Sequence, residues 1–124
     1  MRINNFEEVL SWQKGKQLYI LLSNDFKYEK DFSFKDQLMR AALSITNNIA
    51  EGFDRNSDKE LKYFLVISRG SCAEVRSMLH IAYASKNLQK NRYEELTTLT
   101  TEISKLLTGF IKKLATDSNR LATD

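Results

Sequence analysis

Four capping boxes recur at nearly even intervals along the chain. In a capping box, a Ser or Asn side chain accepts a hydrogen bond from the first backbone N–H groups of a helix, and an acidic residue three positions later reaches back. The four pairs are Asn5 with Glu8, Ser33 with Asp36, Ser57 with Glu60, and Asn91 with Glu94. One pair arises easily by chance. Four pairs, each opening a run of helical period, predict four helices.

The expected helices cover residues 6–25, 34–54, 58–87 and 92–115, and a frayed polar tail is expected from residue 117. The chain has no proline and only four glycines, so little in it interrupts long helices. Short connections between long helices favour antiparallel neighbours. For a chain of 124 residues, the pattern predicts one all-α domain over residues 1–124, an antiparallel up-down-up-down four-helix bundle.

Apolar side chains follow a heptad-like spacing in the third and fourth helices, as in a bundle core. The third helix carries Leu61, Leu65, Ser68, Cys72, Val75, Leu79 and Ala82, and the fourth carries Leu96, Ile103, Leu107, Phe110 and Leu114. In the first helix, the residues expected to face inward are Phe6, Val9, Leu10, Leu18, Leu21, Leu22 and Phe26.

The second helix is apolar over a wider arc than one core-facing stripe requires. At about 100° per residue, one stripe contains Leu38, Ala42, Ile45, Ile49 and Phe53, and a second stripe, further round, contains Met39, Leu43 and Ala50. Either this helix is packed deeply between its neighbours, or the second stripe contacts another subunit. We expect the second, and therefore a closed homo-oligomer with Met39, Leu43 and Ala50 at the subunit boundary.

A polar stripe runs along the same helix, formed by Gln37, Arg40, Ser44, Asn48, Glu51 and Arg55. It is either a solvated face or a set of groups that bond across helices, and Ser and Asn are poor choices for a solvated helix face. If the second and third helices fold back about Asn56, small residues oppose each other. The expected pairs are Ala41 with Ser71, Ala42 with Gly70, and Ser44 with Ser68. This arrangement indicates a structural role rather than a catalytic one.

The inventory of reactive side chains argues against an enzyme. His80 is the only histidine and Cys72 the only cysteine, so neither Glu-x-x-His di-iron pairs nor a Cys/His zinc cluster can be built. There is also no glycine-rich phosphate loop. We expect a non-enzymatic protein with no metal and no cofactor. Arg76 and His80, four residues apart on one helix, leave open a helical-bundle ribonuclease.

The sequence shows no pattern typical of a secretion signal or a membrane span. The N-terminal stretch lacks the basic and apolar regions of a signal peptide, and no apolar run approaches the roughly 20 residues that cross a bilayer. A single cysteine cannot form an internal disulfide, which fits a reducing compartment. We expect a cytoplasmic protein without membrane association.

The net charge of +3 comes from one segment, because residues 57–90 contain six Lys or Arg and three acids while the other segments balance. The basic row expected on the third helix, opposite its apolar seam, consists of Lys62, Arg69, Arg76 and His80, and Lys59 is a further candidate for binding nucleic acid. Such a row is either a solvated face or a surface that neutralises phosphates. A ring of subunits would multiply its field.

A long motif carries a family resemblance. It comprises Ser44, Asn48, Glu51, Gly52, Arg55, Gly70, Ser71 and Glu74, with Phe6-Glu7-Glu8-Val9-Leu10 and Trp12-Gln13-Lys14 before it. The chain resembles the small bacterial four-helix bundle proteins encoded in intervening sequences of 23S ribosomal RNA. That family is similar to the accessory proteins of diversity-generating retroelements. The resemblance implies a homopentamer, and it suggests RNA or DNA and a reverse transcriptase as partners.

The pattern and the resemblance together predict a non-enzymatic oligomeric bundle that binds nucleic acid, or an enzyme acting on nucleic acid, through the third helix. The alternative is an interaction scaffold whose partner is protein alone and whose basic row only solvates the bundle. The ribonuclease is a third and more remote alternative.

Overall fold

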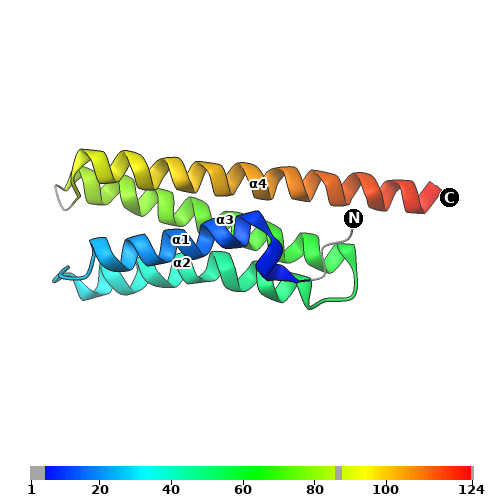
Figure 1. The fold of residues 1–124 in the computed structure, drawn as a ribbon, viewed down its shortest axis with the longest axis horizontal. Coiled ribbons are helices and arrows are strands. Elements are labelled where there is room, and N and C mark those ends of the chain that lie inside the picture. Colours follow the sequence, from blue (N-terminus) through cyan, green and yellow to red (C-terminus); the bar gives the residue numbers. More distant parts are fainter. Residues whose placement is uncertain (1–4, 86–87, 124) are drawn as a thin grey trace.

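The structure, a computed structural model, describes the backbone of residues 5–85 and 88–123 and the side chains of these residues up to 115. A 3₁₀ turn, η1 (Phe6–Glu8), precedes four helices: α1 (Leu10–Asp25), α2 (Phe32–Phe53), α3 (Asp58–Ala84) and α4 (Lys90–Thr123). Figure 1 shows consecutive helices running antiparallel, side by side. Each helix packs on two neighbours, α1 on α2 and α4, and α3 on α2 and α4. With no strand in the described residues, the expected four-helix bundle is confirmed.

Of the four capping boxes, one opens a helix as the pattern predicts. The Ser57 Oγ accepts from the Glu60 backbone N–H at 3.1 Å, and its hydroxyl donates to the Glu60 carboxylate at 3.2 Å. The box at Ser33 is wrong, because α2 begins at Phe32, two residues earlier than expected. There Asp31 is the N-cap, and its carboxylate accepts from the Phe34 N–H at 3.1 Å.

The outer two boxes are also wrong. Asn5 precedes only η1 and caps it through the backbone, so α1 begins after Val9 without a side-chain cap. Asn91 lies inside α4, which begins at Lys90. At the far end, α4 continues to Thr123 where a polar tail was expected from residue 117; no Gly or Pro in residues 110–123 stops it. The expected end of the third helix at residue 87 lies outside the described residues.

The core forms where the heptad pattern placed it. Nearly all of the predicted seam residues of α3 and α4 are buried, with Leu61 and Phe110 half-buried at the edge. In α1, Leu18 and Leu22 are fully buried, whereas Leu10 is 50% exposed and Leu21 is half-buried. The first stripe of α2 is buried as expected except for Phe53, which is half-buried and packs against the core.

Two ion pairs join α1 to α4 and so close the ring of helices. The Arg92 guanidinium donates through Nε and Nη2 to one Asp25 oxygen, each at 2.8 Å, and through Nη1 to Glu95 at 2.7 Å. The hydrogen bond that Arg92 donates to Asp25 raises the pKa of Arg92 above its ordinary value. Lys14 and Glu102 form the second pair at 2.9 Å. These pairs link the chain's first helix to its last.

Residues 5–85 and 88–123 contain neither a membrane-spanning helix nor a cluster of metal ligands. No helix there is long and apolar enough to cross a membrane. Nor does that part of the chain bring together three or more His, Cys, Asp or Glu side chains able to hold a metal ion.

Candidate nucleic-acid interface

The basic row of α3 lies along the junction with α4 rather than opposite the apolar seam. Lys62, Arg69 and Arg76 are seven residues apart, which is nearly two helical turns, so they form an almost straight row with steps of about 10 Å. The half-buried Arg69 donates from Nη1 to the Thr108 hydroxyl of α4 at 3.2 Å. Lys59 is exposed in the first turn of α3. The row therefore borders a second helix that can add to it.

The α4 helix contributes a cation that the sequence analysis missed. Lys105 is exposed and lines the same groove as Arg76 and His80. Charge counted by segment hid it, because residues 91–124 contain five basic and five acidic residues. In the structure three of those acids are engaged elsewhere: Glu94 pairs with Lys90, Glu95 with Arg92, and Glu102 with Lys14. A helical wheel places Lys105 within about 80° of all three acids, so the sequence alone offers no signal that would find this cation.

A groove of about 380 Å³ runs between α3 and α4. Its walls are Arg76 and His80 from α3, and Tyr93, Thr97, Thr98, Thr101, Glu102 and Lys105 from α4. Glu102 is its one acid, and the 2.9 Å pair with Lys14 offsets the charge of that carboxylate. Two cations, Arg76 and Lys105, therefore dominate the field of the groove.

His80 is held by an aromatic cluster at one end of this groove. The Tyr93 hydroxyl lies 2.7 Å from His80 Nδ1, and the two rings meet edge to face with centroids 5.3 Å apart. Tyr83 stacks on Tyr93 at 4.3 Å, with the ring planes within 11° of parallel. Arg76 and His80 do share a groove, as their spacing indicated.

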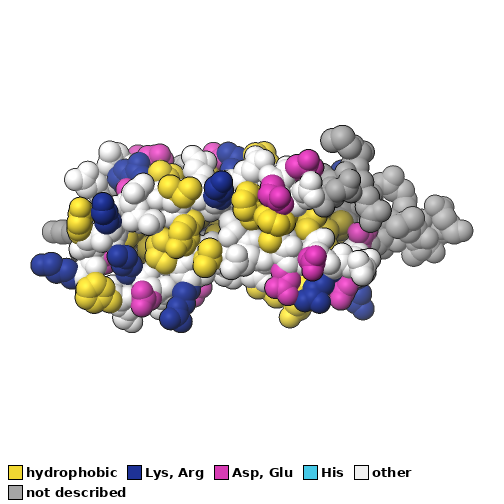
Figure 2. Space-filling model, turned by 60° about the horizontal axis from the view of Figure 1, so that its bottom comes forward, with side chains coloured by type: hydrophobic (Ala, Val, Ile, Leu, Met, Phe, Trp, Pro, Cys, Tyr) yellow, Lys and Arg dark blue, Asp and Glu magenta, His cyan; other side chains and the backbone are white. Residues whose placement is uncertain are grey.

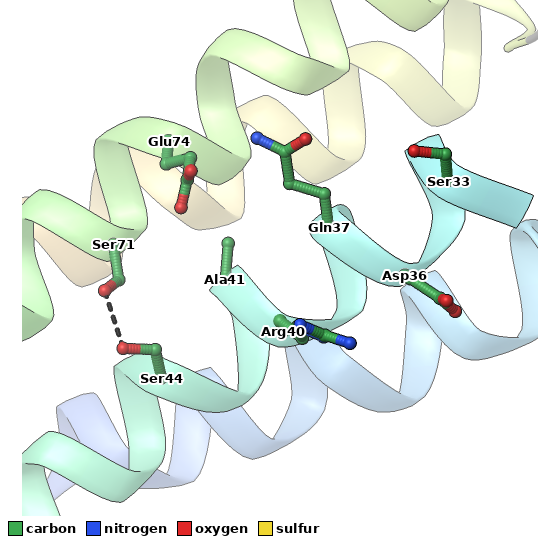
Figure 3. A pocket seen from close by; sticks show the side chains of 8 residues that line it. All are labelled: Ser33, Asp36, Gln37, Arg40, Ala41, Ser44, Ser71 and Glu74. Atoms are coloured by element: carbon green, nitrogen blue, oxygen red, sulfur yellow. Dashed lines mark hydrogen bonds between the residues drawn. The ribbon is translucent and has the colours of Figure 1, made fainter.

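The polar motif joins α2 to α3 through hydrogen bonds. The hydroxyls of Ser44 and Ser71 lie 2.8 Å apart (Figure 3), and the Asn48 amide donates to the Ser44 carbonyl at 2.8 Å and to its hydroxyl at 2.9 Å. The expected pairing of Ser44 with Ser68 is wrong, since Ser68 instead donates to the Ile45 carbonyl at 2.8 Å. Side chains lean toward the N-terminus of their own helix. In an antiparallel pair, a side chain of α2 therefore meets a residue of α3 that lies further along the chain than the one level with its backbone.

The two motif glycines have different surroundings. A Cβ on Gly52 would lie 2.9 Å from Leu61 Cδ1 and 3.1 Å from the Phe64 Cβ, so this glycine permits close approach of α2 and α3. A Cβ on Gly70 would meet nothing within 4 Å, so the expected packing of Ala42 on Gly70 is wrong. Gly70 faces outward because its position on α3 lies away from the α2 contact.

Near the hairpin turn, the expected pair of opposite charge is present. Glu51 and Arg55 form an ion pair at 2.8 Å, and the Arg55 guanidinium lies 5.0 Å from the centre of the Phe64 ring. The pair therefore ties the end of α2 to the first turns of α3.

An open groove of about 600 Å³ adjoins the polar motif between α2 and α3 (Figure 3). It is lined by Ser33, Asp36, Gln37, Arg40, Ala41, Ser44, Ser71 and Glu74. Gln37 and Glu74 extend over it from opposite helices. With two carboxylates and one guanidinium, this surface has no excess of positive charge, unlike the α3–α4 groove.

Exposed large apolar side chains occur on three helices, among them Leu10 and Ile20 of α1, each 50% exposed. Of the three boundary candidates on α2, Leu43 is 43% exposed, whereas Met39 and Ala50 are half-buried. On the outer side of α3, Tyr63, Val66 and Ile81 are 63%, 41% and 56% exposed, a surface that the sequence analysis missed. Figure 2, which views the side where α1 and α2 run, shows several hydrophobic side chains between charged ones.

Comparisons with known proteins agree on the class of fold. A family model described as "23S rRNA-intervening sequence protein" matches residues 7–109. Among solved structures, the chain is similar to a protein of unknown function from the S23 ribosomal protein family of Bacteroides thetaiotaomicron. The two share 24% identity with a TM-score of 0.78, over 83% of this chain and 99% of the other. No curated protein matches.

Proposed function

Because the chain belongs to the 23S rRNA-intervening sequence protein family, we propose that it is a non-enzymatic, oligomeric bundle that binds nucleic acid, or an enzyme acting on nucleic acid, through its α3–α4 face. The observation that carries the proposal is that Arg76 and Lys105 line one groove of that face, with Arg69 beside it on Thr108 of α4 and Lys62 nearly two turns further along α3. Within the described part of the chain, none of these four cations forms an ion pair. Unpaired cations in a row are what a phosphate backbone requires.

The modest charge of one chain is consistent with this role if several copies act together. The net charge is +3, and each phosphate contact adds only a small, salt-dependent increment to affinity. In a closed ring, the rows of neighbouring subunits would sum their fields over one nucleic-acid molecule. Assembly is therefore part of the proposal.

We propose that the bundle forms a closed homo-oligomer, pentameric as the resemblance implies. The support is the presence of exposed apolar side chains on two different helices, Leu43 on α2 and Tyr63, Val66 and Ile81 on α3. Two unlike surfaces that meet head to tail close into a ring, whereas a single self-complementary surface gives a dimer. Burial of these side chains would also remove apolar area from water.

The experiment compares charge reversals on and off the α3–α4 face. Arg76→Glu combined with Lys105→Glu alters two exposed cations of the groove, and Arg40→Glu combined with Lys30→Glu, likewise one exposed Arg and one exposed Lys, is the matched control away from it. Arg69 is left intact because it bonds Thr108. We expect the groove variant to lose affinity for a structured RNA in fluorescence anisotropy. The slope of the logarithm of the affinity against the logarithm of the salt concentration should become shallower by about one for each lost phosphate contact. Equal effects of the two pairs would contradict this interface.

A second candidate function is a scaffold whose partner is protein alone. The outward-facing apolar side chains of α3 and the lack of excess positive charge in the α2–α3 groove favour it. The resemblance suggests a reverse transcriptase as such a partner. Under this alternative, the groove variant described above keeps its protein partner, and the wild type binds no nucleic acid.

A further inference from the structure

We propose that the α3–α4 groove holds one unpaired nucleotide, with its base stacked on the His80 ring and its phosphates on Arg76 and Lys105. The inference rests on the proposed function and names the class of nucleic acid that the site accepts: single-stranded segments rather than duplex. It also assigns His80 a binding role that does not involve catalysis.

The His80 ring is prepared for stacking because its orientation is fixed. The 2.7 Å contact with the Tyr93 hydroxyl holds one ring nitrogen, and Tyr83, stacked at 4.3 Å on Tyr93, supports that tyrosine in turn. His80 itself is exposed and lines the groove. A ring that is already immobile loses little conformational freedom when a base stacks on it.

The cations lie where the phosphates of the same nucleotide can reach. Arg76 is four residues from His80 on α3, a rise of about 6 Å, and Lys105 faces the groove from α4. Glu102, the acid of the groove, is paired with Lys14 at 2.9 Å. An anion entering between the two helices therefore meets two uncompensated positive charges.

Threonines of α4 supply acceptors between the ring and the cations. Thr97 donates its hydroxyl to the Tyr93 carbonyl at 2.7 Å, and Thr101 donates to the Thr97 carbonyl at 2.9 Å. Because their protons are engaged, these oxygens offer lone pairs to the groove. Ribose hydroxyls and the amino groups of bases are donors that fit them.

Duplex nucleic acid cannot use this site fully. In a duplex the bases are stacked on one another and paired, so their faces are inaccessible to a side chain unless a base is unpaired or flipped out. A duplex would engage only the cations. Single strands would gain the stacking contribution as well.

The experiment pairs two substitutions at one position. His80→Ala removes the ring, and His80→Phe keeps an aromatic face while removing the ring nitrogens. The probes are a fluorescent single-stranded RNA and the same strand in a perfect duplex, with circular dichroism as the folding control. We expect His80→Ala to weaken single-strand binding about tenfold. His80→Phe keeps the stacking face but loses the contact with the Tyr93 hydroxyl, so its affinity should lie between those of His80→Ala and the wild type, with duplex binding unchanged in both variants.

A second readout needs no substitution. His80 is the only histidine, so its ring protons give an isolated set of NMR signals in the wild-type protein. Addition of the single strand should shift these signals upfield through the ring current of the stacked base, and the duplex should not. An unchanged His80 signal at saturating single strand would overturn the proposal.

The outcomes separate this inference from the function on which it rests. If the wild type binds no nucleic acid, the proposed function fails first. If it binds but His80→Ala matches wild type, only the stacking site is refuted. If His80→Phe is as weak as His80→Ala, the imidazole acts through its nitrogens and stacking is refuted. RNA cleavage by the wild type that both variants lose would replace stacking with catalysis.

Discussion

Two helical glycines, Gly52 and Gly109, give a direct test of how closely α2 and α3 pack. A Cβ on Gly52 meets Leu61 at 2.9 Å, whereas one on Gly109 meets nothing within 4 Å. We expect Gly52→Ala to destabilise the fold by about 1–3 kcal/mol through overpacking. Gly109→Ala, the control, should stabilise it by up to about 1 kcal/mol because alanine favours the helix. Urea denaturation measures both, and a stabilising Gly52→Ala would contradict the close approach.

The thiol of Cys72 should be unreactive in the folded protein. Burial raises its pKa from 9.0 to about 11, although the nearby Arg76 guanidinium acts in the opposite direction. The fraction of reactive thiolate at pH 8 is therefore about a hundredfold below that of a free thiol. We expect thiol labelling to be slow at pH 8 and fast in denaturing urea. Fast labelling of the folded protein would show that α3 separates from α4 often enough to expose the thiol.

The same pKa shift sets the sign of one pH effect. Because the folded-state pKa is raised, the stabilisation by the protonated thiol is complete below about pH 9 and is lost as the pH rises toward 11. In Cys72→Ala, the free energy of unfolding should therefore fall less steeply with rising pH than in the wild type, and only in that pH range. The other titrating groups are common to both proteins, so the difference between them isolates the thiol.

At the scale of elements, α1 and α4 are held together by an arginine that the sequence did not single out. Arg92 contacts both Asp25 and Glu95, with its side chain 28% exposed. We expect Arg92→Ala to lower the free energy of unfolding by about 1 kcal/mol. Charge-assisted hydrogen bonds that are partly shielded from water contribute more to stability than fully exposed ion pairs do. Lys90→Ala, which breaks a pair at 3.9 Å with a 74% exposed lysine, is the control and should have little effect.

Helix number, order and core residues could be predicted because periodicity records burial directly. The α3 seam, from Leu65 to Ala82, follows from spacing alone. Helix ends were harder, since several acceptors near one boundary compete for the same N–H groups. Ser33 matched the capping pattern, yet Asp31 provides the cap and starts α2 earlier.

The surfaces were the least predictable part of the chain. A helical wheel of one helix does not show which neighbour covers each face, so it could not reveal that Met39, a boundary candidate, packs partly against its own core. Lys105 was missed for the reverse reason, because its position beside Arg76 depends on how α4 packs on α3. A contact between two helices depends on the sequences of both, and the pattern of one helix does not contain that information.

At the scale of the whole molecule, the prediction concerns assembly. Leu43→Glu places a charge on the exposed apolar stripe of α2, and Ile81→Glu does so on α3. We expect the wild type to have the mass of a closed oligomer in size-exclusion chromatography with light scattering. Either substitution should lower the mass toward one subunit while circular dichroism stays helical. A wild-type mass near 14.4 kDa at micromolar concentration would contradict the ring.

The central claim is that the α3–α4 face binds nucleic acid. The most direct measurement is a titration of the wild-type protein with a structured RNA that carries unpaired loops, at about 50 mM salt, where phosphate contacts are strongest. We predict saturable binding whose affinity falls linearly with the logarithm of the salt concentration. No detectable binding at that salt concentration would contradict the claim and leave the protein-only scaffold as the function to pursue.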